Sequence, residues 1–134
     1  MTMKKKELIV TSALPYANGP LHFGHLLEHI QTDIWVRSQR ILGNHCIYLC
    51  ASDAHGTPIM MKAEEENIAP EKLVDKYMKA HKKTLEAFQV SHDCYYQTHS
   101  EENKKYSELI YNKALENGYI KKQNIKKIYD EDKK

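Results

Sequence analysis

The chain has 134 residues, of which 41% are hydrophobic and 28% are charged, a balance typical of one globular domain with a modest core. Its formal net charge of +2 is too small to indicate a polyanionic partner. No apolar run approaches the roughly 20 residues that a membrane-spanning helix requires, so the composition excludes a membrane protein of that kind.

The N-terminus and the cysteines both predict a cytoplasmic protein. Met1–Lys6 is basic, but the apolar run that follows it is three residues long, too short for a secretory signal peptide. The cysteines, Cys46, Cys50 and Cys94, are odd in number and are expected to be reduced thiols. Cys46 and Cys50 stand four apart in an apolar run, where they share one face of a strand. We therefore predict no metal ligands in this chain.

The first predicted elements are a strand, a turn and a helix. Leu8–Ser12 is apolar and β-branched, which predicts a strand buried on both faces. A turn rich in Pro, Asn and Gly leads into a helix predicted over Leu21–Leu42, with Gly43 as its stop. This helix is expected to bury five apolar side chains, Leu26, Leu27, Ile30, Ile34 and Ile41.

A second apolar run, Cys46–Ala51, predicts a buried strand parallel to the first, because a helix that joins two strands forms a right-handed βαβ unit. The loop Asp53–Pro58 then lies at the carboxyl end of this strand, where open α/β sheets bind ligands. A short helix is predicted over Ile59–Glu66. A longer one begins at Pro70 and carries apolar residues at helical spacing as far as Phe88.

The remaining sequence predicts a third strand and a further helix. Val90–Thr98 is predicted as a strand, and Ser100 as the cap of a helix that ends at Asn117-Gly118. Tyr119–Tyr129 alternates apolar and basic residues, which fits a hairpin or the start of an insertion. Together these elements make one βαβαβ half, whereas a doubly wound nucleotide domain has two. We therefore expect the chain to be the front part of a longer protein.

The turn and the first helical turn are the candidate nucleotide site. His22 and His25 stand three apart, so their side chains leave the same face of the helix. A helix N-terminus presents unpaired N–H groups and the positive end of its dipole to anions. Gly24 has no Cβ, so a base or a sugar can lie against the backbone there. This pattern predicts a protein that handles ATP.

The same residues resemble a known family. Leu14–Gly19 (LPYANG), followed by His22–His25 (HFGH), is similar to the "HIGH" signature of the class I aminoacyl-tRNA synthetases. Asp53–Pro58 (DAHGTP) resembles the methionine-specific members rather than those for isoleucine, valine or leucine. The similarity spans about Ile9 to Asp130. It implies an α/β fold, the first half of a Rossmann-like parallel-sheet nucleotide-binding domain.

The resemblance implies the reaction and its partners. In this family methionine and ATP, with Mg²⁺, give methionyl-adenylate and pyrophosphate, and methionine then passes to tRNA(Met). Residues 1–118 would form the first half of the catalytic domain, and residues 119–134 the start of the connective-peptide insertion. Zinc occurs in one branch of the family, on ligands that lie past Asp130 and are absent from this chain. The oligomeric state is left open.

The resemblance also assigns site residues by position. His22 and His25 match the histidines that contact the ATP phosphates and stabilise the transition state, and Asp53 matches the acid that holds the methionine ammonium. The ATP site is expected to comprise Asn18, His22, Gly24 and His25, and the methionine site Ala13, Leu14, Tyr16 and Asp53. His55 is interpreted as a residue that holds its loop. The other histidines, His29, His45, His81, His92 and His99, are interpreted as surface or packing residues.

Some parts of the family pattern are changed or missing. Phe23 replaces an aliphatic residue of the signature, and Ser52 stands where a second acid is common. No Lys-Met-Ser-Lys-Ser-like loop is present, so the lysines that grip the triphosphate from the other side are missing. We expect the 134 residues alone to be inactive and at best marginally folded.

Two other function classes share part of the pattern. A small, complete nucleotidyltransferase also begins a helix with His-x-Gly-His, but it needs a later basic phosphate clamp and a finished sheet, neither of which follows Gly118. A non-catalytic binding domain that kept the fold would be expected to lose the motif histidines or the acid. His22, His25 and Asp53 are all present, which favours the enzyme.

Overall fold

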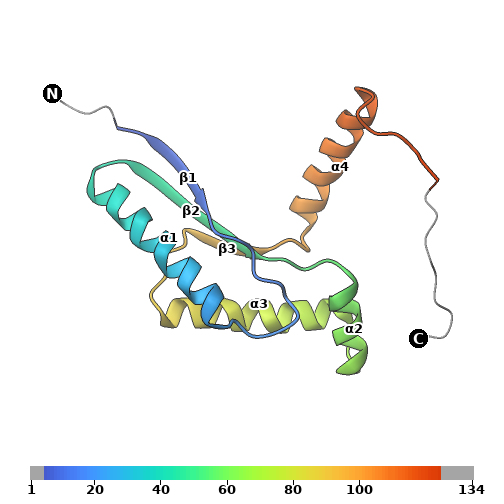
Figure 1. The fold of residues 1–134 in the computed structure, drawn as a ribbon, viewed down its shortest axis with the longest axis horizontal. Helices are drawn as coiled ribbons and strands as arrows, with labels where there is room; N and C mark the ends of the chain where they lie inside the picture. Colours follow the sequence, from blue (N-terminus) through green and yellow to red (C-terminus); the bar gives the residue numbers. More distant parts are fainter. Residues whose placement is uncertain (1–4, 125–134) are drawn as a thin grey trace. The chain divides into compact units, whose positions relative to one another are not determined.

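The computed structural model describes residues 5–124 of the chain. The chain divides into two compact units, Met1–Ser100 and Glu101–Lys134, and each is described by itself. Among the described residues, the first unit contains a parallel sheet and three helices, and the second contains the helix α4 (Glu101–Glu116) (Figure 1). Within the described residues, no helix is long and apolar enough to cross a lipid bilayer.

The sheet has three parallel strands in the order β1-β2-β3. These are β1 (Glu7–Thr11), β2 (His45–Ser52) and β3 (Cys94–Gln97), with β2 in the centre. In register, Leu8 pairs with Cys46, and Cys50 pairs with Tyr95. The alternation of strands and helices confirms the predicted Rossmann-like α/β fold.

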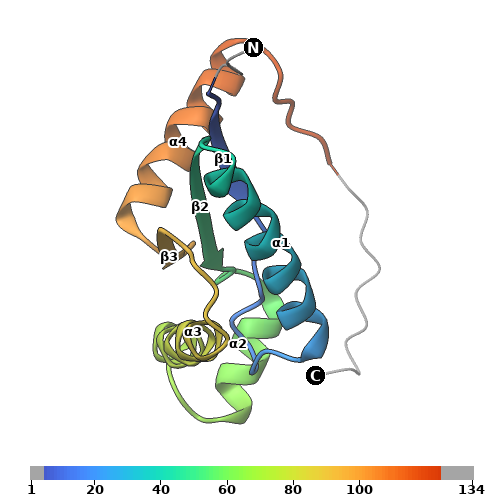
Figure 2. The same cartoon turned by 90° about the vertical axis from the view of Figure 1, so that its left-hand side faces the viewer.

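Helices α1 (Phe23–Ile41) and α3 (Pro70–Ala87) both pack against the sheet, and α2 (Thr57–Glu65) packs against α3 (Figure 2). Alternate residues of β2 from Cys46 to Ser52 are buried, so both helices cover the same face of this strand. One core cluster joins this face to the helices and comprises Val36, Cys46, Tyr48, Leu85 and Val90. A second cluster lies around α2 and the start of α3 and comprises Ala17, Ala54, Ile59, Ala63, Leu73 and Val74.

The predicted burial of β1 and α1 is wrong in part. Ile9 is 73% exposed, so β1 is buried on one face only, because helices α1 and α3 cover a single side of the sheet. On α1 the residues Leu27, Ile34 and Ile41 are exposed, and Leu26 and Ile30 are half-buried. The fully buried positions of α1 are instead His29, Asp33 and Val36.

Hydrogen bonds explain why polar residues of α1 face the sheet. The His29 Nδ1 atom lies 3.1 Å from Ser12 Oγ, and the Asp33 carboxylate accepts the Ser91 backbone N–H at 2.7 Å. Burying a polar side chain is unfavourable unless it finds such partners. Because these partners lie 17 and 58 residues away, the periodicity of α1 alone did not reveal which face is buried.

The remaining elements agree with the predictions except near the ends. Strand β3 is shorter than the predicted Val90–Thr98, and residues 90–93 form the loop before it. Helix α4 ends at Glu116, just before the predicted stop at Asn117-Gly118, and Gly118 has a positive φ of 73°. Residues 119–124 have no regular secondary structure, and the rest of the predicted hairpin lies outside the described residues.

Candidate functional site

The start of α1 is closed by a reciprocal pair of histidine hydrogen bonds. His22 is the N-cap, and its Nδ1 atom accepts the Gly24 backbone N–H at 3.1 Å. The Nδ1 atom of His25 accepts the His22 backbone N–H at 3.2 Å. The two rings are stacked with their centroids 3.7 Å apart. This is the arrangement of a capping box, with imidazole nitrogens in place of the usual hydroxyl and carboxylate oxygens.

These caps set the proton positions on both rings. Because each Nδ1 accepts a backbone N–H, the neutral ring must carry its proton on Nε2. Neither Nε2 atom has a partner among the described residues, so both N–H groups remain available to an anion at the positive end of α1. Burial, followed by the charge of His22, lowers the pKa of His25, which favours this neutral donor form.

Gly24 makes room for the first of these rings. A Cβ at this position would lie 3.0 Å from the His22 ring, closer than such atoms normally approach. In this conformation glycine is needed at position 24 so that the His22 ring can lie over the backbone and cap the helix. A sugar that lies against Gly24, as the sequence predicts, would require the His22 ring to turn.

Asp53 lies beside the turn that precedes α1. The residue follows β2, its backbone N–H donates to the Pro15 carbonyl at 2.8 Å, and its own carbonyl accepts from Ala17 at 2.8 Å. Tyr16 and Asp53 form an isolated parallel bridge, which extends the pairing of β1 and β2 beyond the strands. The structure thus brings together Tyr16 and Asp53, two of the residues predicted to bind the amino acid.

The Asp53 carboxylate is half-buried and lightly bonded. The Thr98 hydroxyl lies 3.5 Å from its Oδ1 atom, and the same hydroxyl accepts the Ala54 backbone N–H at 2.8 Å. Such a carboxylate keeps most of its lone pairs for a cationic ligand. His55 holds the loop as predicted, since its ring bonds to the Thr98 carbonyl and its own carbonyl accepts the Tyr16 hydroxyl.

The other predicted site residues, Ala13, Leu14 and Asn18, lie in the segment between β1 and α1. Ala13 and Leu14 are exposed, and the Ala13 backbone N–H donates to the Glu28 carboxylate at 2.6 Å. Asn18 is half-buried in the turn between Tyr16 and His22. A cavity of about 180 Å³ lies at the loop after Asp53 and is lined by Ala54, His55, Gly56, Met60, Pro70, Glu71, Val74 and His99.

His81 is a positioning residue that sequence reasoning missed. It is fully buried on α3, where its Nε2 atom lies 2.7 Å from the Gly19 carbonyl and its Nδ1 atom 2.9 Å from Ser52 Oγ. Ser52 also contacts the Tyr95 hydroxyl at 2.9 Å. His81 therefore ties the turn before α1 to the end of β2. Its helical spacing with Leu73, Val74 and Leu85 indicated burial, but nothing in the sequence indicated the Gly19 contact.

Gly56 is required by the same loop, and we expect Gly56→Ala to destabilise the protein by about 1–3 kcal/mol. Its φ of 122° and ψ of 166° lie in a region that only glycine adopts readily. An added Cβ would also overlap the Tyr16 hydroxyl. Urea unfolding of the variant and the parent protein measures the loss.

Gly19→Ala is the matched control for this prediction. A Cβ at Gly19 meets no atom within 4 Å, and its φ is not positive, so the change should stay within about 0.5 kcal/mol. Equal losses in the two variants would show that the Gly56 conformation is not the cause.

Comparison with known proteins identifies a matching family model and solved structures with a similar fold. The family model described as "tRNA synthetases class I (M)" matches residues 8–134. A solved structure of Mycobacterium tuberculosis methionyl-tRNA synthetase bound by methionyl-adenylate is 24% identical, covers 85% of this chain and superposes with a TM-score of 0.81. A second structure, of the same enzyme in complex with methionyl-adenylate, is 23% identical, covers 86% and has a TM-score of 0.82. The chain spans 22% of the length of either structure.

Proposed function

The chain belongs to the family of class I tRNA synthetases (M), and from this premise we propose that the whole protein activates methionine with ATP and transfers it to tRNA(Met). The observation that carries the proposal is the pair of capped histidines at the start of α1, whose Nε2–H groups stay available to phosphate. Their position in the family signature agrees with this chemistry. Methionine as the amino acid is supported by the two similar solved structures.

The proposed activation step is a displacement at phosphorus. A carboxylate oxygen of methionine forms a bond to the α-phosphorus of ATP, and the bond from that phosphorus to the pyrophosphate oxygen breaks. Charge builds up on the phosphate oxygens in the transition state. His22 and His25 donate from Nε2 to these oxygens, and preorganised donors stabilise this charge more than they stabilise bound ATP. Mg²⁺ enters as part of the ATP substrate.

Asp53 is proposed to bind the methionine ammonium. A carboxylate in a half-buried loop forms a charge-assisted hydrogen bond that is stronger than one between neutral groups. Ala13, Leu14 and Tyr16 are proposed as the near wall of the pocket for the methionine side chain, and Asn18 and Gly24 as further ATP contacts. The Tyr16–Asp53 bridge supports this grouping because it holds the wall next to the acid.

The test is exchange of labelled pyrophosphate into ATP by the full-length protein. We expect exchange that depends on methionine, with methionyl-adenylate as the enzyme-bound product. The 134-residue chain serves as the negative control, because its sequence contains no Lys-Met-Ser-Lys-Ser-like loop that would bind the triphosphate. Pyrophosphate exchange that does not depend on methionine but requires a phosphorylated acceptor would identify a nucleotidyltransferase instead.

A further inference from the structure

Three potential metal ligands from distant parts of the chain meet beneath the sheet. His29 lies on α1, Cys50 on β2 and His92 in the loop before β3, and one ligand atom from each lies within 4.8 Å of the others. His29 and Cys50 are buried, and His92 is half-buried. We propose that His29, Cys50 and His92 bind one Zn²⁺ ion. The proposal is independent of the proposed function and of any zinc bound beyond this chain.

The spacing of the two imidazole nitrogens fits a tetrahedral ion. His29 Nδ1 and His92 Nε2 are 3.4 Å apart. Two nitrogens bound at about 2.0–2.1 Å to a tetrahedral Zn²⁺ are separated by roughly the same distance. Ser12 Oγ lies 3.1 Å from His29 Nδ1 and 3.6 Å from Cys50 Sγ, which places the hydroxyl next to the fourth position. Two imidazoles and one thiolate form a donor set that suits zinc.

Each of the three side chains must reach its metal-binding state. Zinc takes a lone pair from a neutral imidazole and binds a thiolate, so the Cys50 thiol must lose its proton. Binding forms one zinc–sulfur bond and releases the thiol proton to solvent.

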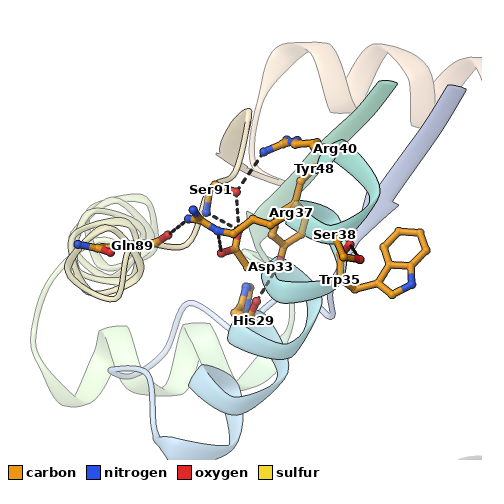
Figure 3. A network of polar contacts seen from close by, with 9 residues as sticks. All are labelled: His29, Asp33, Trp35, Arg37, Ser38, Arg40, Tyr48, Gln89 and Ser91. Atoms are coloured by element: carbon orange, nitrogen blue, oxygen red, sulfur yellow. Dashed lines mark hydrogen bonds and ion pairs between the residues drawn. The ribbon is translucent and has the colours of Figure 1, made fainter. Parts of the chain in front are cut away.

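The loop that carries His92 is held against α1 before any ion binds (Figure 3). The Asp33 carboxylate accepts hydrogen bonds from both the backbone N–H and the hydroxyl of Ser91. Arg40 donates to the Ser91 hydroxyl at 3.1 Å, and Arg37 donates to the Gln89 carbonyl. These contacts fix the residue next to His92, and a prearranged ligand costs less conformational entropy on binding.

His92 also lines a cavity of about 230 Å³. Glu86 on the wall of this cavity favours a cation and Lys82 opposes it, while the Asp93 carboxylate is already paired with Arg40 at 2.6 Å.

The test compares the zinc content of the full-length protein with that of three variants, each purified in the presence of a weak chelator. We expect Cys50→Ser and His92→Gln each to hold one zinc ion per chain fewer than the parent, and any zinc bound elsewhere cancels in the difference. Cys94→Ser is the matched control, because Cys94 is an exposed cysteine outside the cluster. It should hold as much zinc as the parent.

A second readout identifies the sulfur ligand. After replacement of zinc by Co²⁺, the parent minus Cys50→Ser difference spectrum should contain a thiolate-to-cobalt charge-transfer band. His92→Gln removes one of the three ligands, so it should weaken binding of the added metal by at least about tenfold to a hundredfold, the loss that follows removal of even an outer-shell partner. It also gives an independent comparison if Cys50→Ser does not fold, because His92 is only half-buried. Equal zinc content in all four proteins, or equal loss in Cys94→Ser, would overturn the proposal and leave a hydrogen-bonded core cluster.

Discussion

His25→Ala should lower the rate of methionine-dependent pyrophosphate exchange by about a hundredfold to a thousandfold in the full-length protein. The Nε2–H group of His25 lies at the positive end of α1 and is proposed to donate to oxygens that gain charge only in the transition state. Its loss should therefore reduce kcat much more than it raises the KM for ATP. Steady-state exchange over a range of ATP concentrations separates the two parameters.

Two variants distinguish this role from helix capping. His25 also accepts the His22 backbone N–H, so His25→Ala should cost about 0.5–2 kcal/mol of stability as a lost cap. His25→Glu restores an acceptor at the same helix position, and the unfolding free energy should recover. The exchange rate should not recover, because a carboxylate cannot donate and repels phosphate. Recovery of the rate would assign His25 to capping alone. His45→Ala, at an exposed histidine, is the surface control.

Asp53→Asn should raise the KM for methionine by about tenfold to a hundredfold while the KM for ATP changes little. The substitution keeps the shape of the side chain and its contact with the Thr98 hydroxyl, but it removes the negative charge proposed to face the ammonium. A hydrogen bond to a charged group contributes about 1.5–3 kcal/mol, which corresponds to that change in affinity. Exchange measured over a range of methionine concentrations gives the value.

A surface carboxylate provides the control for Asp53. Asp75 is exposed on α3, so Asp75→Asn changes the net charge by the same amount and should leave both KM values unaltered. Methionine analogues that lack the amino group give a further comparison, because they should bind the parent and Asp53→Asn equally. An equal rise in the KM for ATP and for methionine would contradict a specific ammonium contact.

Much of the fold follows from local patterns in the chain. Apolar runs and helical spacing predicted the two strands β1 and β2 and the helices α1 and α3 to within about two residues at their starts and ends, because each element repeats its own period. The predicted start of strand β3 was less accurate, because residues 90–93 form a loop that is hydrogen-bonded to Asp33. The assignment of ATP and methionine contacts to particular residues stays a prediction.

Short-range sequence predicted a helix start at His22–His25 but not the histidine cap, although His22, Gly24 and His25 contact one another within a single helical turn. It did not reveal that His81 bonds to Gly19, or that His29, Cys50 and His92 meet. These contacts join residues 21–63 positions apart, and no periodic pattern encodes them. They depend on the packing of α1 and α3 against one face of the sheet, which is decided by hydrogen bonds and side-chain shape across the whole unit.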